Sequence, residues 1–291
     1  MGKPSQSDSA ATLPDQKTRR ALINLLGDDD REIAQTVRAK ILSYGQLARP
    51  WLEVESLHDD PLIRRRIRGV LTVLQREEAD VRFMTFCRHH GEEFDLEEGI
   101  WFLSQTRYPE INAEGYRAIL DEWAIRLKEA LKPYRKGESR LAVINEFLFT
   151  ELGFRGNEDN YYDPENSYLN RVVDRRSGNP ISLCLIYILI GRRLAMPIAG
   201  IGFPGHFLCR YQSSVEEHYI DAFNQGKLLT KAQCMQYLTE NGLGVREGYL
   251  VPISARRVLL RICANLHQIY LKFSETEEAA RVQRYLVALA R

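Results

Sequence analysis

The sequence predicts a mostly helical protein of the α+β class, and three observations lead to this fold class. First, apolar residues recur at helical spacing both before and after the middle of the chain. Second, Ile181 to Leu194 is apolar nearly all round, as expected of a buried helix. Third, the runs that follow it are typical of short strands: Ile198 to Phe203, Phe207 to Gln212 and Tyr219 to Phe223. We therefore expect a buried helix against a small antiparallel sheet, flanked by helical hairpins.

The composition is that of a globular chain and narrows the classes of partner. Its 291 residues are 44% hydrophobic and 27% charged, which leaves room for a sizeable core and one to three domains. The 40 basic residues nearly balance the 39 acidic ones, and the formal net charge is +1. Since this balance gives no general attraction to nucleic acid or to an anionic membrane, we expect neither as a partner.

The five cysteines are widely spaced, odd in number and without a Cys-x-x-Cys pair. We therefore expect reduced thiols, no zinc site and no cofactor. Residues 1–14 are rich in Ser, Ala and Pro and lack an apolar segment, which predicts a disordered start and a cytoplasmic location. The run His89-His90 with Glu92-Glu93 is similar to a metal-binding cluster, but adjacent helix residues point to different faces, so a solvated surface is favoured.

Residues 15–133 predict a region of stacked helices. Ile33, Val37 and Ile41 recur at helical spacing after an acidic turn, and a second turn before Pro61 leads into a similar stripe. The two copies resemble HEAT-type helical pairs, although their spacing of roughly thirty residues is shorter than the usual period. The arginines at 64, 65, 66 and 68 could bind phosphate, but they spread around most of a helix, so a solvated face is favoured.

The remaining boundaries follow from turn residues and caps. Pro133 and the segment 134–139 predict a linker, so the core is expected over 140–250. Ser254 caps the first of two amphipathic helices that fill 254–291.

A polar cluster precedes the buried helix. Asn166, Tyr168 and Asn170 could line a binding groove, or they could satisfy backbone groups of the loop. Asn179 stands immediately before Pro180, where proline suits the first turn of a helix and asparagine suits its cap. All four polar residues, Asn179 included, are candidate binding residues.

Cys184, His206 and Asp221 occur in an order that would suit a thiol enzyme. A thiolate is the nucleophile, an imidazole activates it, and a carboxylate orients the imidazole. His206 follows a Pro-Gly turn at a strand start and Asp221 lies in the next strand, so the two are expected to be neighbours. Each residue also has a structural alternative: Cys184 as a buried inert thiol, His206 as a ring bonded to a backbone carbonyl, and Asp221 as the cap of the turn 224–226.

The stretch Asn-Ser-Tyr-Leu-Asn-Arg at 166–171, with Ser-Gly-Asn-Pro at 177–180 and Gly-Phe-Pro-Gly-His-Phe-Leu at 202–208, resembles the SirB1 family, whose core is a transglutaminase-like domain. The resemblance covers roughly 145–238 and extends loosely into the tail after Ser254. It implies a papain-like core that carries a Cys, His and Asp triad in working members. It also implies that the helical pair at 254–291 is similar to a tetratricopeptide repeat.

The resemblance also raises a question of register. In the family that this chain resembles, active transglutaminase-like domains have a Gly-x-Cys pattern at the start of the buried helix and a Gly-Ile-Pro pattern at its end. Without gaps, this pattern places Gly178 at the glycine and Pro197 at the closing proline, so Pro180 takes the nucleophile position and is expected to face His206. Cys184 then lies one turn, about 6 Å, further along the helix among apolar neighbours, where a raised pKa is expected.

These observations lead to three hypotheses for function. The first is a non-catalytic or cryptic member of the fold that binds a protein or peptide and carries helical arms. The second is a cysteine hydrolase or acyltransferase that acts on protein amides through Cys184, His206 and Asp221. The third is a structural scaffold in which the core spaces the two helical ends. We favour the first.

Overall fold

The computed structural model describes residues 13–89, 95–244 and 246–290, and it has the mostly helical α+β architecture that the sequence predicts. These residues form two compact units. Unit 1 includes the described residues up to Val81 together with Thr106–Glu110, and unit 2 includes the rest. The division falls inside a helix, at a different place from the expected linker at 134–139. The domain boundaries, like the disordered start at 1–14, stay predictions, and the start lies outside the described residues except for Leu13 and Pro14.

Unit 1 is a small stack of helices with its own apolar core. It contains α1 (Gln16–Leu26), α2 (Arg31–Leu42), a 3₁₀ turn (Gly45–Ala48), α3 (Arg49–Glu55) and the first part of α4 (Pro61–His89). The acidic turn before α2 acts as a cap, because the Asp30 side chain accepts a hydrogen bond from the Glu32 amide at 2.8 Å. Residues of all these elements share one core: Ile23, Leu26, Val37, Ile41, Ala48, Trp51, Leu52, Ile63, Ile67, Val70, Leu71 and Leu74. One member of the predicted stripe, Ile33, is 40% exposed and lies outside that core.

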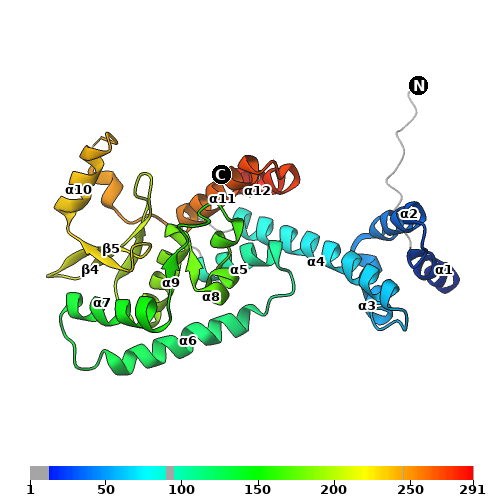
Figure 1. The fold of residues 1–291 in the computed structure, drawn as a ribbon, viewed down its shortest axis with the longest axis horizontal. Coiled ribbons are helices and arrows are strands. Elements are labelled where there is room, and N and C mark those ends of the chain that lie inside the picture. Colours follow the sequence, from blue (N-terminus) through cyan, green and yellow to red (C-terminus); the bar gives the residue numbers. More distant parts are fainter. Residues whose placement is uncertain (1–12, 90–94, 245, 291) are drawn as a thin grey trace. The chain divides into compact units, whose positions relative to one another are not determined.

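Unit 2 contains the remaining helices and both sheets (Figure 1). Its helices are α5 (Leu96–Arg107), α6 (Ala113–Ala130), α7 (Gly137–Asn145), α8 (Leu169–Arg175), α9 (Pro180–Arg193), α10 (Lys231–Glu240), α11 (Ala255–Lys272) and α12 (Thr276–Leu289). A π-helical segment (Glu146–Glu151) and two 3₁₀ turns (Pro164–Ser167 and Glu247–Leu250) connect them. The expected helices of 254–291 are α11 and α12, which pack against each other, while their repeat type stays a prediction.

The main sheet has four antiparallel strands in the order β3-β4-β5-β6. They are β3 (Ile198–Ile201), β4 (Leu208–Gln212), β5 (Glu217–Asp221) and β6 (Lys227–Leu229). The sequence predicts the first three, although β5 ends two residues earlier than expected because Asp221 starts a tight turn, in which the Gly226 amide donates to the Asp221 carbonyl at 2.9 Å. Two further short strands, β1 (Arg155–Gly156) and β2 (Ser177–Gly178), form a separate parallel pair.

The two faces of the main sheet are covered by different helices. Side chains alternate along a strand, so Leu208 and Cys209 of β4 point to opposite faces. Cys209 lies against α9, where its thiol donates to the Cys184 carbonyl. Leu208 lies on the other face in a cluster with Tyr219 of β5 and Leu238 of α10. Figure 1 shows α9 and α10 on the two sides of this sheet.

Helix α9 forms the centre of unit 2. Its residues from Pro180 to Gly191 are all buried, as the sequence predicts, and they pack against α6, β3 and β4. The Asn179 side chain accepts from the Ser182 amide at 3.0 Å, and the Ser182 hydroxyl accepts from the Asn179 amide at 3.0 Å. At the C-terminal end of α9, Arg193 forms an ion pair with Glu97 at 2.9 Å. Its positive charge also interacts favourably with the negative end of the helix dipole.

Helix α7 begins inside the segment that the sequence predicts to be a linker. Its first residue is Gly137, and the Glu138 amide donates to the Glu216 carboxylate at 3.2 Å. Glu216 belongs to the turn between β4 and β5, so this helix start is capped from a distant part of the chain.

Among the helices that the structure describes, none is both long and apolar enough to cross a bilayer.

We expect Asn179→Ala to lower the free energy of unfolding by about 2 kcal/mol, because it removes a helix cap in a buried setting and the hydrogen bond that Asn179 donates to Ser167 at 2.9 Å. Urea unfolding followed by circular dichroism measures this change. Thr230→Ala, which removes the exposed cap of α10, is the matched control and should cost about 1 kcal/mol or less. Equal losses in the two variants would contradict a central role for α9.

Candidate functional site

An imidazole–carboxylate pair lies at one end of the main sheet. His206 precedes β4 in the loop that follows Pro204-Gly205, and Asp221 is the last residue of β5. The Nε2 atom of His206 lies 2.9 Å from Oδ1 of Asp221, and the side chains are 19% and 9% exposed. The expectation that these two residues are neighbours is confirmed.

Asp221 also holds the turn that follows it. Its Oδ1 accepts from the Asn224 amide at 3.2 Å and its Oδ2 accepts from the Asn224 side chain at 2.7 Å. Burial opposes ionisation of this carboxyl, but the hydrogen bond and charge of His206 and the hydrogen bonds of Asn224 outweigh it and hold the pKa of Asp221 below its ordinary value. The alternative reading of Asp221 as the cap of the turn 224–226 is therefore confirmed alongside its contact with His206.

The contact with Asp221 fixes how His206 presents its ring. A carboxylate on Nε2 favours the tautomer that carries its proton there and leaves Nδ1 as an acceptor. Among the described residues, no hydrogen bond engages Nδ1. Phe223 packs edge-on against the ring, with centroids 6.2 Å apart, and Arg261 donates to the His206 carbonyl at 3.2 Å. The ring is therefore held on two sides while one nitrogen stays available.

The pair opens onto a pocket between the sheet and α10, which we call the α10 pocket. Its volume is about 460 Å³, within the range of sites that bind small ligands or a few peptide side chains. Apolar and polar groups both line it: Phe203, His206, Leu208, Asp221, Asn224, Lys227, Leu229, Gln233, Cys234 and Tyr237. It combines an apolar wall with convergent polar groups, as a recognition site requires.

Cys184 lies outside this pair. It is fully buried, and its thiol donates to the Phe207 carbonyl at 3.6 Å. Burial, reinforced by the neighbouring Cys209, raises the pKa of the Cys184 thiol well above its ordinary value. In the part of the chain that the structure describes, no hydrogen bond joins Cys184 to His206. The structure therefore brings two of the three candidate triad residues together and confirms that Cys184 is buried.

The α9 start fits part of the expected register. Pro180 is the first residue of α9 and is buried, and Cys184 follows one turn later. The contacts described for the His206 ring are with Asp221 and Phe223. That Pro180 occupies the nucleophile position and faces His206 stays a prediction.

The four candidate binding residues before α9 are buried rather than arranged along an open groove. The side-chain amide of Asn166 donates to the carbonyls of Asn160 and Tyr161. The hydroxyls of Tyr168 and Tyr270 form a hydrogen bond at 2.9 Å. Asn179 caps α9. Asn170 is 2% exposed, and its Oδ1 has no partner among the described residues. These contacts agree with the alternative in which the cluster satisfies groups of the loop.

Sequence reasoning missed the α10 side of the site, including Lys227, Cys234 and Tyr237. The alternation of strand residues carries part of the signal, because it places Leu208 and Tyr219 on the same face as Asp221. The metal-like run His89-His90 with Glu92-Glu93 lies outside the residues whose side chains are described. Within the described residues, no three His, Cys, Asp or Glu side chains gather as metal ligands.

Comparison with known proteins identifies the family of this chain. A family model described as the transglutaminase-like superfamily matches residues 114–264, which is more than half of the chain. The chain belongs to the transglutaminase-like superfamily. Its transglutaminase-like core thus includes α9, the main sheet and the His206–Asp221 pair.

Several curated proteins are similar to this chain. The UPF0162 protein of Xylella fastidiosa is 35% identical over 185 residues, 62% of this chain and 66% of that protein, so the chain spans slightly under two thirds of its length. The UPF0162 protein of Vibrio cholerae is 28% identical over 156 residues, 53% of this chain and 57% of that protein. The F-box only protein 21 of Mus musculus is 37% identical over 134 residues, 43% of this chain and 21% of that protein. No solved structure matches the chain.

We expect Cys184 to react with iodoacetamide more slowly than Cys234 in the folded protein near pH 8. Both thiols are buried, but Cys234 lines the α10 pocket and burial raises its pKa only to about 11, whereas the pKa of Cys184 is raised well above its ordinary value. Peptide mass spectrometry at successive times gives both rates, and the urea-unfolded protein, in which all five thiols should react, is the control. Fastest labelling at Cys184 would indicate an activated nucleophile.

We expect Asp221→Asn to lower the free energy of unfolding at pH 7 by about 2 kcal/mol, the usual range for a hydrogen bond to a charged group. The folded-state pKa of Asp221 is depressed, so its contribution is present above the unfolded pKa of about 4 and is lost as the pH falls through the folded value. The difference between wild type and variant should therefore narrow below pH 4. Urea unfolding across this range tests it, with exposed Asp159→Asn as control.

Proposed function

We propose that this chain is a SirB1-like protein that uses its transglutaminase-like core as a non-catalytic, regulatory module for binding a protein or peptide. One observation carries the proposal: the His206–Asp221 pair opens onto the α10 pocket, while the candidate nucleophile Cys184 is fully buried and does not line that pocket. We also propose a cytoplasmic location, which the five free cysteines support. HEAT-like helices before the core in the sequence and tetratricopeptide-like helices after it complete the proposal.

The pocket has the features of a peptide site. Tyr237 is 42% exposed and leans over Phe203, with ring centroids 5.4 Å apart, so an aromatic wall stands next to the polar pair. Lys227, directly opposite Asp221 in the sheet register, adds a positive charge at the rim. Aromatic surface contributes affinity, and the available Nδ1 of His206 can accept a hydrogen bond from a peptide amide.

The same geometry disfavours chemistry in this state. The thiolate is the nucleophile of such enzymes, and each unit by which the pKa of Cys184 is raised lowers its thiolate fraction about tenfold at neutral pH. Access compounds this effect, because Cys184 contacts Phe207 and Cys209 on the α9 face of the sheet. A bound peptide in the α10 pocket would therefore meet the imidazole without meeting the thiol.

A cysteine hydrolase or acyltransferase that acts on protein amides is the second candidate. The observation that favours it is the pair itself, since Asp221 orients His206 and leaves Nδ1 able to accept a proton. In this mechanism, Cys184 would give its proton to His206 and attack an amide carbonyl, and the amine would leave with that proton as a thioester forms. Cys184 would first have to move away from the Phe207 carbonyl.

A binding experiment tests the proposed module. Peptides selected from a random phage library on wild-type protein are measured by fluorescence anisotropy against variants. We expect Tyr237→Ala to weaken binding about tenfold, the effect of losing one aromatic anchor of about 1.4 kcal/mol. Tyr134→Ala is the matched control, because Tyr134 is 40% exposed and does not line the pocket. Failure to select peptides, or equal effects of both variants, would overturn the proposal.

A turnover experiment separates the two candidates. The selected peptides are synthesised with a glutamine residue. They are then incubated, in the presence of free amines, with wild-type protein and with Cys184→Ala. We expect intact peptide in both samples by mass spectrometry. Cleaved, deamidated or amine-linked peptide with wild type alone would establish the enzyme and exclude a purely binding role.

A further inference from the structure

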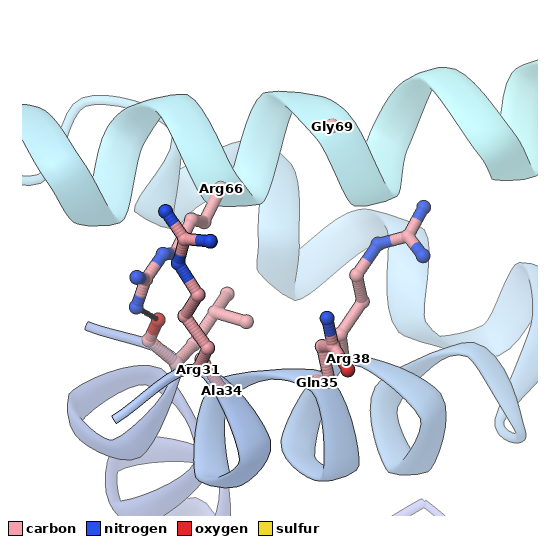
Figure 2. A pocket seen from close by; sticks show the side chains of 7 residues that line it. Arg31, Ala34, Gln35, Arg38, Arg66 and Gly69 are labelled. Carbon is pink, nitrogen blue, oxygen red and sulfur yellow. Dashed lines mark hydrogen bonds between the residues drawn. The ribbon is translucent and has the colours of Figure 1, made fainter. Parts of the chain in front are cut away.

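Unit 1 contains a second surface, which lies between α2 and α4 and which we call the arginine groove. It has a volume of about 250 Å³ and is lined by Leu26, Arg31, Ala34, Gln35, Arg38, Arg66 and Gly69. Figure 2 shows the α2 residues on the side of that helix that faces α4, which contributes Arg66 and Gly69. None of these residues lines the α10 pocket.

The floor of the groove is apolar. Leu26 is 1% exposed and Ala34 is 7% exposed, and both belong to helices that build the core of unit 1. Gly69 borders open space, since a Cβ atom added there would meet no atom within 4 Å. A glycine in the middle of a helix costs roughly 0.5–1 kcal/mol relative to alanine.

The rim of the groove is positively charged. Three of the seven lining residues are arginines and none is acidic. Arg66 is fixed in place, because its Nη1 donates to the carbonyls of Leu26 and Asp28 at 2.6 Å each. Arg31 and Arg38 lie seven residues apart on one face of α2, about 10 Å along its axis. Within the described residues, neither has an ion-pair partner.

This arrangement separates Arg66 from the rest of the basic run at 64–68. Arg64 donates to the carbonyls of His58 and Asp59, and Arg65 and Arg68 do not line the groove. The solvated-face interpretation thus suits those three, while Arg66 joins two arginines from another helix. Only the folded chain brings this set together.

We propose that the arginine groove binds an acidic segment of a partner protein that carries one large apolar side chain between carboxylates. The volume is smaller than the roughly 300–1,000 Å³ of cofactor and small-molecule pockets, so it suits one or two inserted side chains. Guanidinium groups at both ends match carboxylates, which they bind through paired hydrogen bonds. Nucleic acid would use the arginines but not the apolar floor, so the acidic segment fits the surface better.

The test uses a fluorescein-labelled peptide of about 12 residues, with a central phenylalanine and glutamates on both sides, a length that spans the two arginine positions if helical. A control peptide replaces every glutamate with lysine. We expect the acidic peptide to bind full-length protein at least about tenfold more tightly by fluorescence anisotropy, and its affinity to fall as salt is added.

Variants locate the binding site. Arg31→Glu and Arg38→Glu should each weaken the acidic peptide about tenfold or more, since each replaces an attractive contact with a repulsive one. Arg65→Glu makes the same charge change on exposed α4 surface outside the groove, and it should have little effect. Gly69→Leu should place a bulky side chain in the groove and abolish binding without lowering the melting temperature, because leucine favours helix more than glycine does and its Cβ atom meets open space. Tyr237→Ala, in the α10 pocket, should leave this binding unchanged.

Any of the following results would overturn the proposal. Equal affinity for the acidic and basic peptides, or no binding of the acidic one, would exclude charge recognition. An equal loss in Arg65→Glu would indicate general attraction instead of a site, and full binding by Gly69→Leu would place the peptide elsewhere. Displacement of the peptide by oligo-deoxythymidine, or protein self-association through this surface, would assign the groove to another occupant. Each result is independent of the α10 pocket, so it leaves the proposed function of the core to its own experiment.

Discussion

The burial of α9 from Pro180 to Gly191 is the constraint on which unit 2 depends. A helix that is apolar all round has no face to give to water, so α6 and the main sheet must both pack on it. Its polar ends still need partners, which Asn179, Ser182 and Arg193 supply. The same burial decides the chemistry of Cys184, because a thiol inside this helix is removed both from water and from substrates.

The pleat of the sheet explains why only two of the three candidate triad residues come together. His206 and Asp221 line the pocket on the α10 face, whereas Cys209 contacts Cys184 on the α9 face. Cys184 therefore packs on the α9 side of the sheet and is absent from the residues that line the pocket. Binding of a peptide needs only the α10 face of the sheet. Catalysis would also need the Cys184 thiol to reach that face from the α9 side.

Much of this architecture could be predicted from local patterns. The apolar run of α9, the strand character of β3 to β5 and the nearness of His206 to Asp221 all follow from periodicity and turn residues. Features that depend on distant residues could not be predicted in this way. The start of α7 is capped by Glu216 from another turn, and Ile33 fits the helical stripe but meets no core on its side. The α10 pocket and the arginine groove likewise exist only where separate elements meet.

The double contact of Asp221 affects how descent should be read from such sites. Its Oδ1 contacts the imidazole and also accepts from the Asn224 amide, and its Oδ2 accepts from the Asn224 side chain in the turn that leads to β6. A chain with no reaction to perform would still lose stability if this aspartate changed, so selection for folding alone is sufficient to retain it. In diverged members of the superfamily, a histidine–aspartate pair is therefore weak evidence that the protein is still an active enzyme. A thiol that solvent can reach would be stronger evidence.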